Sequence, residues 1–428
     1  MLLYLFCNKS HYENVPFEIP KNWVWCKLDD LAFYKKGPFG SSLTKSMFIP
    51  DNGNAYKVYE QKNAIQKDSH LGHYFISSEK FQELKGFEVL PNDIIVSCAG
   101  TIGETYIMPS DIRSGIINQA LMIIRLHNID ITPFYLLYFD FILKNEAGKD
   151  GKGTAIKNIP PFDILKNYWI PLPPLAEQDR IIKEVALWQC LIDSIDGNIE
   201  DIFKLSKKTK SKILDLAISG KLVPQDPNDE PAIELLKRIN PGFEPCDNSH
   251  YENLPENWCL AKVKDVFVIN PRNKAEDNTI AGFIPMTLID DGYSNTFSYE
   301  KRKWGAIKTG FTHFADGDVA VAKISPCLEN RKSIVLRDLP NGIGAGTTEL
   351  HVFRSSVVSP EYALYFFKSE YFISRCVGTF NGVVGQQRVG KNIIEEIQIP
   401  IPPINEQTKI VSTIETIFTQ LNTITAEL

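Results

Sequence analysis

Apolar residues near the middle of the chain recur with an average spacing of 3.5 residues, the repeat with which a helix buries a seam against another helix. Two interleaved rows carry the pattern: Gln178, Val185, Ile192, Ile199, Ser206 and Ile213, and Ile181, Trp188, Ile195, Ile202, Thr209 and Leu216. The rows return 229 positions later as Gln407, Ile414, Leu421 and Leu428, with Ile410, Ile417 and Ile424. The sequence therefore predicts two amphipathic helices in the same register.

A proline pair opens each of these helices. The first follows Ile170–Gln178, with the letters IPLPPLAEQ, and the second follows Ile399–Gln407, with IPIPPINEQ. Proline is tolerated at the start of a helix, and Glu177 and Glu406 fall in the first turn, where the helix dipole favours a negative charge. A central helix over residues 175–217 would be about 65 Å long at 1.5 Å per residue.

The segments between the helices also repeat. Each copy begins with a Pro-x-Asn-Trp motif and a strand-like run, and later has an acidic turn before a buried strand and a proline that starts an aromatic helix. The paired segments are Ser10–Pro16 and Ser249–Pro255, Pro20–Trp23 and Pro255–Trp258, Val24–Leu31 and Cys259–Val266, Asn92–Val96 and Gly317–Val321, and Pro133–Phe139 and Pro360–Phe366. The chain is predicted to be a tandem duplication of domain and helix.

Short strands and frequent glycine turns within each repeat indicate an α+β fold, without the regular strand–helix alternation of a parallel sheet. The expected organisation is a domain at 1–170, a central helix at 171–219, a linker at 220–248, a second domain at 249–399 and a C-terminal helix at 400–428. The proline-rich linker contains Gly220, which can end the helix, and a predicted short helix at Ala232–Ile239.

Composition narrows the class of protein. With 428 residues and 43% hydrophobic content, the chain can form two cores, and no stretch has the length of a membrane span. The eight cysteines include no pair at CxxC spacing, which favours reduced thiols in the cytoplasm over disulfides or a zinc site. The net charge of −6 argues mildly against a nucleic-acid binder, although local clustering of basic groups matters more.

Several fragments imitate catalytic motifs without completing them. In Asn158–Phe162, an inserted Ile159 breaks the Asn-Pro-Pro-aromatic motif of adenine methyltransferases, and no GxGxxG supplies a cofactor pocket. Gly151–Thr154 lacks the upstream glycine of a phosphate loop, and Gly342–Gly346 leads into a strand rather than a helix. We expect no catalytic, cofactor-binding or metal-binding residues in this chain.

Polar and basic residues on glycine-rich loops are the remaining candidates for function. Lys and Arg can neutralise phosphates, and Asn, Gln and Arg can pair with base edges, so these loops suggest a nucleic-acid surface, although each loop alone is typical of a solvated turn. The candidate DNA-binding residues are Lys35, Lys36, Ser41, Ser42, Gln61, Lys62, Ser97, Thr101, Lys149 and Lys152 in the first repeat, and Arg272, Lys274, Lys323, Ser325, Asn330, Arg331, Lys332, Gln387 and Arg388 in the second.

Several of these motifs resemble the specificity subunit of type I restriction–modification systems, and the resemblance covers nearly the whole chain. It is carried by the Pro-x-Asn-Trp openings, the two proline-rich helix starts and the segment Ile213–Asp226. Further matches are Ser97–Gly103, Asn118-Gln119, Lys323–Cys327, Glu329-Asn330 and Thr347–Glu349.

The resemblance implies two target-recognition domains, each reading one half of a split, asymmetric site in double-stranded DNA, and long helices that pair antiparallel as a coiled-coil spacer. Two methyltransferase subunits would bind the helices and supply S-adenosylmethionine chemistry at adenine N6. Restriction subunits would supply ATP- and Mg-dependent translocation and cleavage. The chain itself would be non-catalytic.

The second helix is shorter than the first, which departs from the family pattern. The residues expected to pair the helices are Val185, Trp188, Ile192, Ile195, Ile199, Ile202, Ile410, Ile414, Ile417, Leu421 and Ile424. The shorter helix would leave the seam from Val185 to Ile199 uncovered. Three explanations stay open: a shortened chain, coverage by methyltransferase subunits, or self-association with another copy.

Two readings from other classes also stay open. A stand-alone enzyme would methylate or cleave DNA without added subunits. A coiled-coil scaffold with two protein-binding domains would not change the methylated sequence when one domain is exchanged.

Overall fold

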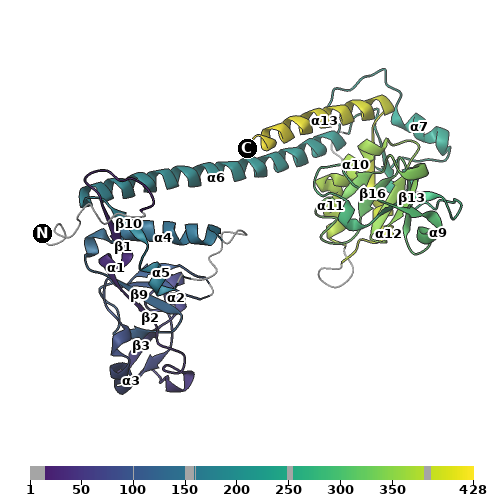
Figure 1. Ribbon diagram of the computed structural model, residues 1–428. Helices are drawn as coiled ribbons and strands as arrows, with labels where there is room; N and C mark the ends of the chain where they lie inside the picture. Colours follow the sequence, from purple (N-terminus) through teal and green to yellow (C-terminus); the bar gives the residue numbers. More distant parts are fainter. Residues whose placement is uncertain (1–14, 100, 150–158, 160, 248–253, 380–386) are drawn as a thin grey trace. The chain divides into compact units, whose positions relative to one another are not determined.

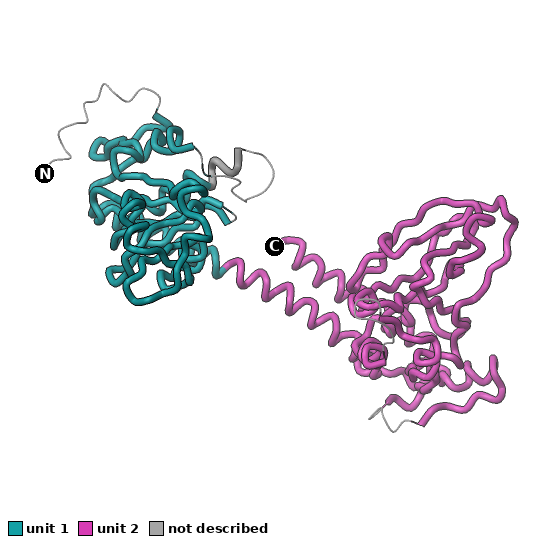
Figure 2. Tube along the Cα trace, turned by 90° about the horizontal axis from the view of Figure 1, so that it is seen from below, with its two compact units in different colours: residues 1–194 teal, residues 195–428 magenta. Residues whose placement is uncertain are grey.

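The computed structural model describes residues 15–99, 101–149, 159, 161–247, 254–379 and 387–428, with the backbone alone for 144–149. The chain divides into two compact units, residues 1–194 and 195–428 (Figure 2). The division falls inside the long helix α6, Leu175–Ile218, which starts in unit 1 and ends in unit 2 (Figure 1).

Unit 1 contains two four-stranded sheets, in the orders β2-β9-β6-β7 and β4-β3-β8-β5, and a two-stranded ribbon of β1 and β10. β3 and β8 are parallel, and the other pairs are antiparallel. The strands are β1 Val24–Lys27, β2 Ala32–Lys36, β3 Tyr56–Tyr59, β4 Phe75–Ile76, β5 Glu88–Val89, β6 Ile94–Ser97, β7 Thr105–Ile107, β8 Gly115–Ile117, β9 Leu121–Leu126 and β10 Trp169–Leu172; the helices before α6 are α1 Leu28–Leu31, η3 Lys45–Met47, α2 Gln61–Ile65, α3 Ser78–Glu83, η4 Lys85–Phe87, η5 Ile129–Ile131, α4 Thr132–Lys149 and α5 Phe162–Leu165.

Unit 2 repeats this plan. Its sheets have the orders β12-β19-β16-β17 and β14-β13-β18-β15, with β13 and β18 parallel, and β11 and β20 form the ribbon. The elements are β11 Cys259–Lys262, β12 Val268–Ile269, β13 Ile280–Ile284, β14 Glu300–Lys303, β15 Thr312–Ala315, β16 Val319–Ala322, β17 Ser333–Val335, β18 Ile343–Gly346, β19 Leu350–Arg354, β20 Gln398–Ile401, α7 Ala232–Ile239, α8 Val263–Val266, η6 Met286–Leu288, α9 Trp304–Ile307, η7 Pro340–Gly342, α10 Pro360–Lys368, α11 Glu370–Val377, α12 Lys391–Glu396 and α13 Ile404–Ala426. The predicted duplication, α+β fold and short linker helix are confirmed.

The acidic turns that lead into buried strands hold equivalent ion pairs in the two units. Asp93, before β6, accepts two hydrogen bonds from Arg125 on the neighbouring strand β9, at 2.6 and 2.7 Å. Asp318, before β16, accepts two from Arg354 on β19, both at 2.7 Å. Both carboxylates are buried, so each needs its cation to offset the loss of water.

The predicted strands over Val24–Leu31 and Cys259–Val266 are wrong in their second halves. After four strand residues, the chain turns into the short helices α1 and α8. A carboxylate three residues on accepts the backbone N–H that starts each helix: Asp30 from Lys27 at 2.8 Å, and Asp265 from Lys262 at 3.2 Å. Each side-chain hydrogen bond satisfies a backbone N–H at the start of a helix, which has no partner within the helix itself.

Within unit 2, the C-terminal part of α6 packs antiparallel to α13 (Figure 1). Ile213, Leu214 and Ala217 of α6 share a buried cluster with residues of α13, and Lys210 Nζ donates to Asn422 Oδ1 at 2.6 Å. Among the predicted pairing residues of α13, Ile410 and Ile414 are fully buried, and Ile417 and Leu421 are partly buried. The expected antiparallel seam is confirmed here.

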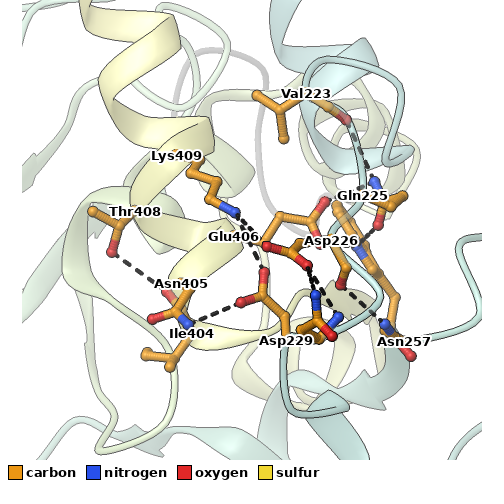
Figure 3. A network of polar contacts seen from close by, with 12 residues as sticks. Val223, Gln225, Asp226, Asp229, Asn257, Ile404, Asn405, Glu406, Thr408 and Lys409 are labelled. Carbon is orange, nitrogen blue, oxygen red and sulfur yellow. Dashed lines mark hydrogen bonds and ion pairs between the residues drawn. The ribbon is translucent and has the colours of Figure 1, made fainter.

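A polar network fixes the start of α13 against the linker (Figure 3). The Glu406 carboxylate accepts from Trp258 Nε1 at 2.9 Å and from Gln225 Nε2 at 2.8 Å. Asn405 Nδ2 donates to Asp229 Oδ1 at 2.9 Å. Because Glu406 is almost completely buried, desolvation raises the pKa of its carboxyl. The network joins the linker, the second Pro-x-Asn-Trp motif and the helix into one frame.

The other part of the predicted seam is open to solvent. Trp188 is 58% exposed and Ile195 is 57% exposed, and Val185 and Ile192 are also exposed. Ile199 and Ile202 are partly buried. The exposed apolar stripe that the sequence predicted is therefore present on α6.

Candidate nucleic-acid interface

Strand register brings four polar loops of unit 1 together where several strands of its sheets end; we call this side of the sheets their edge. β2 ends at Lys36, which faces Met122 at the start of β9, and β6 ends at Ser97, which faces Leu121. β3 ends at Tyr59, which faces Ile117 at the end of β8. The loops that follow these strands, and the turn between β8 and β9, therefore meet. We call residues 36–42, 61–63 at the start of α2, 97–99, 101–103 and 118–120 the interface loops of unit 1.

Backbone contacts hold these loops close together. Gly37 N donates to Leu121 O at 2.9 Å, and Cys98 N donates to Ala120 O at 2.8 Å. A Cβ on Gly37 would lie only 1.8 Å from Asn118 O, so this position requires glycine for the close approach. Gln61 Nε2 donates to Ala99 O, which connects the loop after β3 to the loop after β6.

The predicted residues of unit 1 fall into two groups. Lys36 and Ser41 are exposed on the first loop, Ser42 is partly exposed and Thr101 is exposed on the third. Ser97 is buried, and its hydroxyl donates to Thr101 O and accepts from Glu104 N, so it shapes the turn.

Two further lysines of unit 1 have partners within the protein. Lys62 pairs with Glu60 at 2.9 Å, and the Lys35 ammonium lies 4.8 Å from the centre of the Phe87 ring. The Lys149 side chain and Lys152 lie outside the described residues.

Unit 2 collects its loops in the same way. β12 ends beside Phe353 of β19, β16 ends beside Leu350 at the start of β19, and β13 ends beside Gly346 at the end of β18. A bridge between Ile324 and Arg388 brings a further loop to this edge. We call residues 270–274, 323–332, 347–349 and 387–388 the interface loops of unit 2.

These loops line a cleft of about 340 Å³ that carries two of the predicted cations. Arg272 and Lys323 lie at its wall, together with Thr312, His313 and Thr348. No carboxylate among the described residues forms an ion pair with either cation. The Arg272 guanidinium donates to a carbonyl oxygen, that of Phe311 at 3.4 Å. Unpaired cations with hydroxyl neighbours are suited to a phosphate group.

Two buried histidines support the cleft as neutral imidazoles. His351 lies between the Asn270 side-chain amide, 3.4 Å from Nδ1, and Val389 O, 3.2 Å from Nε2. Asn270 thus donates to Nδ1, and Nε2–H donates to the carbonyl. Burial lowers the pKa of His351 to about 4, with a further contribution from Lys323. Burial also lowers the pKa of His313.

Several predicted residues of unit 2 are engaged within the protein. Arg331 donates to Lys368 O at 3.0 Å and pairs with Glu370 at 2.7 Å, and Lys332 Nζ donates to Ile289 O at 2.8 Å. Ser325 Oγ donates to Glu329, and Arg388 makes two bonds to Glu349 at 2.7 and 2.9 Å. These residues shape the loops. Lys274 and Asn330 are exposed, and Gln387 is partly exposed.

Some residues at the two edges were not identified from sequence. Thr312 and His313 belong to strand β15, so no loop signal marked them. Phe39 is highly exposed at the tip of the first interface loop of unit 1, and no polar or charged group marks it as a DNA-binding candidate. The described residues include no group of three or more His, Cys, Asp or Glu side chains placed to hold a metal ion. No helix in the described part of the chain has the length and apolar character needed to cross a membrane.

Comparisons with known proteins agree with this arrangement. The family model described as "Type I restriction modification DNA specificity domain" matches residues 20–185 and 255–428. The chain is 40% identical over 265 residues to the EcoEI specificity subunit of Escherichia coli, covering 56% of this chain and 44% of that protein. It is 42% identical over 224 residues to the EcoAI specificity subunit, covering 48% and 38%. The matches thus span less than half the length of these two relatives.

A more distant relative and two solved structures match nearly the full chain. The MjaVIII specificity subunit of Methanocaldococcus jannaschii is 21% identical over 433 residues, covering 95% of this chain and 88% of that protein. A chain of a solved structure described as "Structural basis underlying complex assembly and conformational transition of the type I R-M system" has a TM-score of 0.54 at 16% identity, covering 96% of this chain and 94% of that chain. The HsdS subunit of Thermoanaerobacter tengcongensis has a TM-score of 0.52 at 16% identity, covering 96% and 93%. The two structures share the fold.

Proposed function

The chain belongs to the type I restriction modification DNA specificity family, and on this basis we propose that it selects the DNA sequence for a type I restriction–modification complex. Each unit reads one half of a split target in double-stranded DNA through its interface loops. The protein acts in the cytoplasm and performs no catalysis itself.

The observation that carries this proposal is the repeated gathering of polar loops at the same sheet edge of two equivalent units. Arg272 and Lys323 in unit 2, which form no ion pair with a described carboxylate, and exposed Lys36 in unit 1 provide charge for phosphates. The exposed or partly exposed Ser41, Thr101, Lys274, Asn330 and Gln387 complete the set. Because the loops of the two units differ in sequence, two different half-sites, and thus an asymmetric target, are expected.

Membership of the specificity family is also the basis on which we propose the subunits that bind this chain. Two methyltransferase subunits, carrying S-adenosylmethionine, dock on the helices, and restriction subunits add ATP- and Mg-dependent cleavage. The exposed stripe of Val185, Trp188, Ile192 and Ile195 is a suitable docking surface, because side chains of this size gain stabilisation when buried. Self-association through the same stripe is the alternative, and light scattering of the purified chain distinguishes it as a concentration-dependent dimer.

A domain exchange tests the recognition role. Residues 24–157 are replaced by the equivalent segment of a relative, and methylated adenines are mapped across the host genome. We expect one half of the methylated sequence to change and the other half to persist. An unchanged methylated sequence would contradict recognition by unit 1. Methylation or cleavage of DNA by the pure chain without added subunits would instead show a stand-alone enzyme.

A further inference from the structure

Phe39 is 87% exposed, the largest exposed fraction among the large apolar side chains that the structure describes. Single exposed apolar residues are common on protein surfaces, so exposure alone assigns no role. Phe39 differs in two respects: its backbone is fixed on both sides, and it stands among polar groups at the interface edge of unit 1.

The backbone around Phe39 has little freedom. On one side, Pro38 is buried and Gly37 N donates to Leu121 O. On the other side, Ser42 N donates to Phe39 O at 2.8 Å, which closes a tight turn. A Cβ on Gly40 would lie 2.7 Å from Gln119 Oε1, so the turn rests on the β8–β9 connection. The ring is therefore held out in water before any ligand binds, which reduces the entropy cost of an insertion.

The surroundings of Phe39 do not form an apolar patch. Lys36 and Ser41 flank it as exposed residues, and Gln119 lies beneath the turn. No other large apolar side chain on the described interface loops of unit 1 is exposed. A protein-docking surface of this kind would be expected to be contiguous and apolar. A lone aromatic ring beside a lysine is suited to a ligand with flat apolar faces and a phosphate backbone, which is a nucleic acid.

We propose that Phe39 inserts between two adjacent base pairs in the half-site read by unit 1 and unstacks them. This inference rests on the proposed function, since it names how the DNA is deformed at that interface. Insertion of an apolar side chain opens one base step and kinks the duplex. The energy required depends on the sequence of that step, so Phe39 contributes specificity without a hydrogen bond to a base.

The test uses the full chain assembled with its methyltransferase subunits and duplexes of the mapped target. A 2-aminopurine base is moved through the half-site, one position per duplex, and its fluorescence is measured with and without the complex. Apart from the adenine that is methylated, which the methyltransferase subunits flip out of the stack, the parent should raise the fluorescence at a single step. Phe39→Ala should abolish that rise and weaken target binding by ~10-fold, because stacking of an aromatic ring on a base contributes at this level.

Two variants control the interpretation. Phe39→Trp keeps a flat ring and should retain both the fluorescence rise and the affinity. Phe141→Ala removes another half-exposed phenylalanine, on α4, and should behave as the parent. If Phe39→Ala left the affinity and the fluorescence of the bound target at parental values, insertion would be refuted while recognition by unit 1 stood. Failure of the parent complex to prefer its target over a scrambled duplex would refute the proposed function and this inference together.

Discussion

At the scale of single residues, neutral His351 connects Asn270, at the start of one interface loop of unit 2, with Val389, the residue that follows another. Its Nδ1 accepts a hydrogen bond, so protonation would place a proton against the Asn270 donor. The folded protein therefore resists protonation, and the pKa falls from 6.5 to about 4 mainly through burial. Stability from the neutral imidazole is present above pH 6.5 and is lost as the pH falls toward 4, because the unfolded chain then binds the extra proton.

We predict that the free energy of unfolding of unit 2 decreases by up to about 3 kcal/mol between pH 7 and pH 4 on account of His351. The variant His351→Gln should be less stable at pH 7 and should lose this part of the pH dependence. Urea denaturation at a series of pH values measures both effects. The same substitution at exposed His73 serves as the control, and an equal slope in His351→Gln and the parent would show that His351 is not responsible.

Gly37 provides a second prediction at this scale. In Gly37→Ala, the new methyl group would meet Asn118 O at 1.8 Å, so the loop that carries Lys36 and Phe39 must move. We expect lower thermal stability and weaker binding of the unit 1 half-site. Gly86→Ala is the matched control, because no heavy atom lies within 4 Å of its Cβ position. Parental stability and binding in Gly37→Ala would mean that the loop adapts without loss.

At the scale of secondary-structure elements, the pairing of α6 and α13 depends on a few fully buried side chains. Ile414 lies in the cluster that joins the two helices, whereas Ile424, ten residues later on α13, is 52% exposed. Ile414→Ala should destabilise unit 2 by about 2–5 kcal/mol, since it removes buried methyl groups and leaves a cavity. Ile424→Ala should change stability by less than about 0.5 kcal/mol. Similar losses in both variants, measured by urea denaturation, would argue against this seam.

Elements with a long repeat were predictable, and short ones were not. The helices α6 and α13 are 44 and 23 residues long, so their apolar repeat recurs several times, and proline pairs mark their starts. Periodicity and the prolines together located them. The four-residue helix α1 could not be separated from a strand by hydrophobic spacing, because a single helical turn is too short to show a period. Its helical form depends on the Asp30 side chain, a local bond that hydrophobic spacing does not reveal.

The candidate site was predictable only as a set of loops. Lys36, Lys323 and Arg272 stand at the interface edges, but Ser97 and Arg331 are occupied by internal contacts. Sequence could not separate these groups for two reasons. The partners of Arg331 lie far along the chain, and the Ser97 hydroxyl is engaged by a local turn whose backbone geometry has no sequence signal. The exposure of the apolar Phe39 was not predictable either, since it follows from the contacts of Gly37 and Gly40.

At the scale of the whole molecule, a net charge of −6 limits how tightly the chain can bind DNA without its partner subunits. We predict weak DNA binding by the isolated chain in about 0.2 M salt, because few phosphates are neutralised, and tighter binding once methyltransferase subunits are added. Ile192→Glu, on the exposed stripe of α6, should prevent the gain from added subunits and leave the weak binding unchanged. Electrophoretic mobility shifts and pull-downs measure these effects. Tight, site-specific binding by the isolated chain would contradict the prediction.

The two-stranded ribbons have a consequence for how recombination can change the gene. Each unit starts its sheets after one strand of a ribbon and returns through the other: β1 pairs with β10 from Val24 to Leu172, and β11 pairs with β20 from Cys259 to Ile401. All interface loops of a unit therefore lie between two neighbouring points of the backbone. A pair of genetic crossovers, one in the codons for each strand of a ribbon, would replace every loop of one unit together and leave the helical frame intact. A lineage could acquire a new half-site in one event.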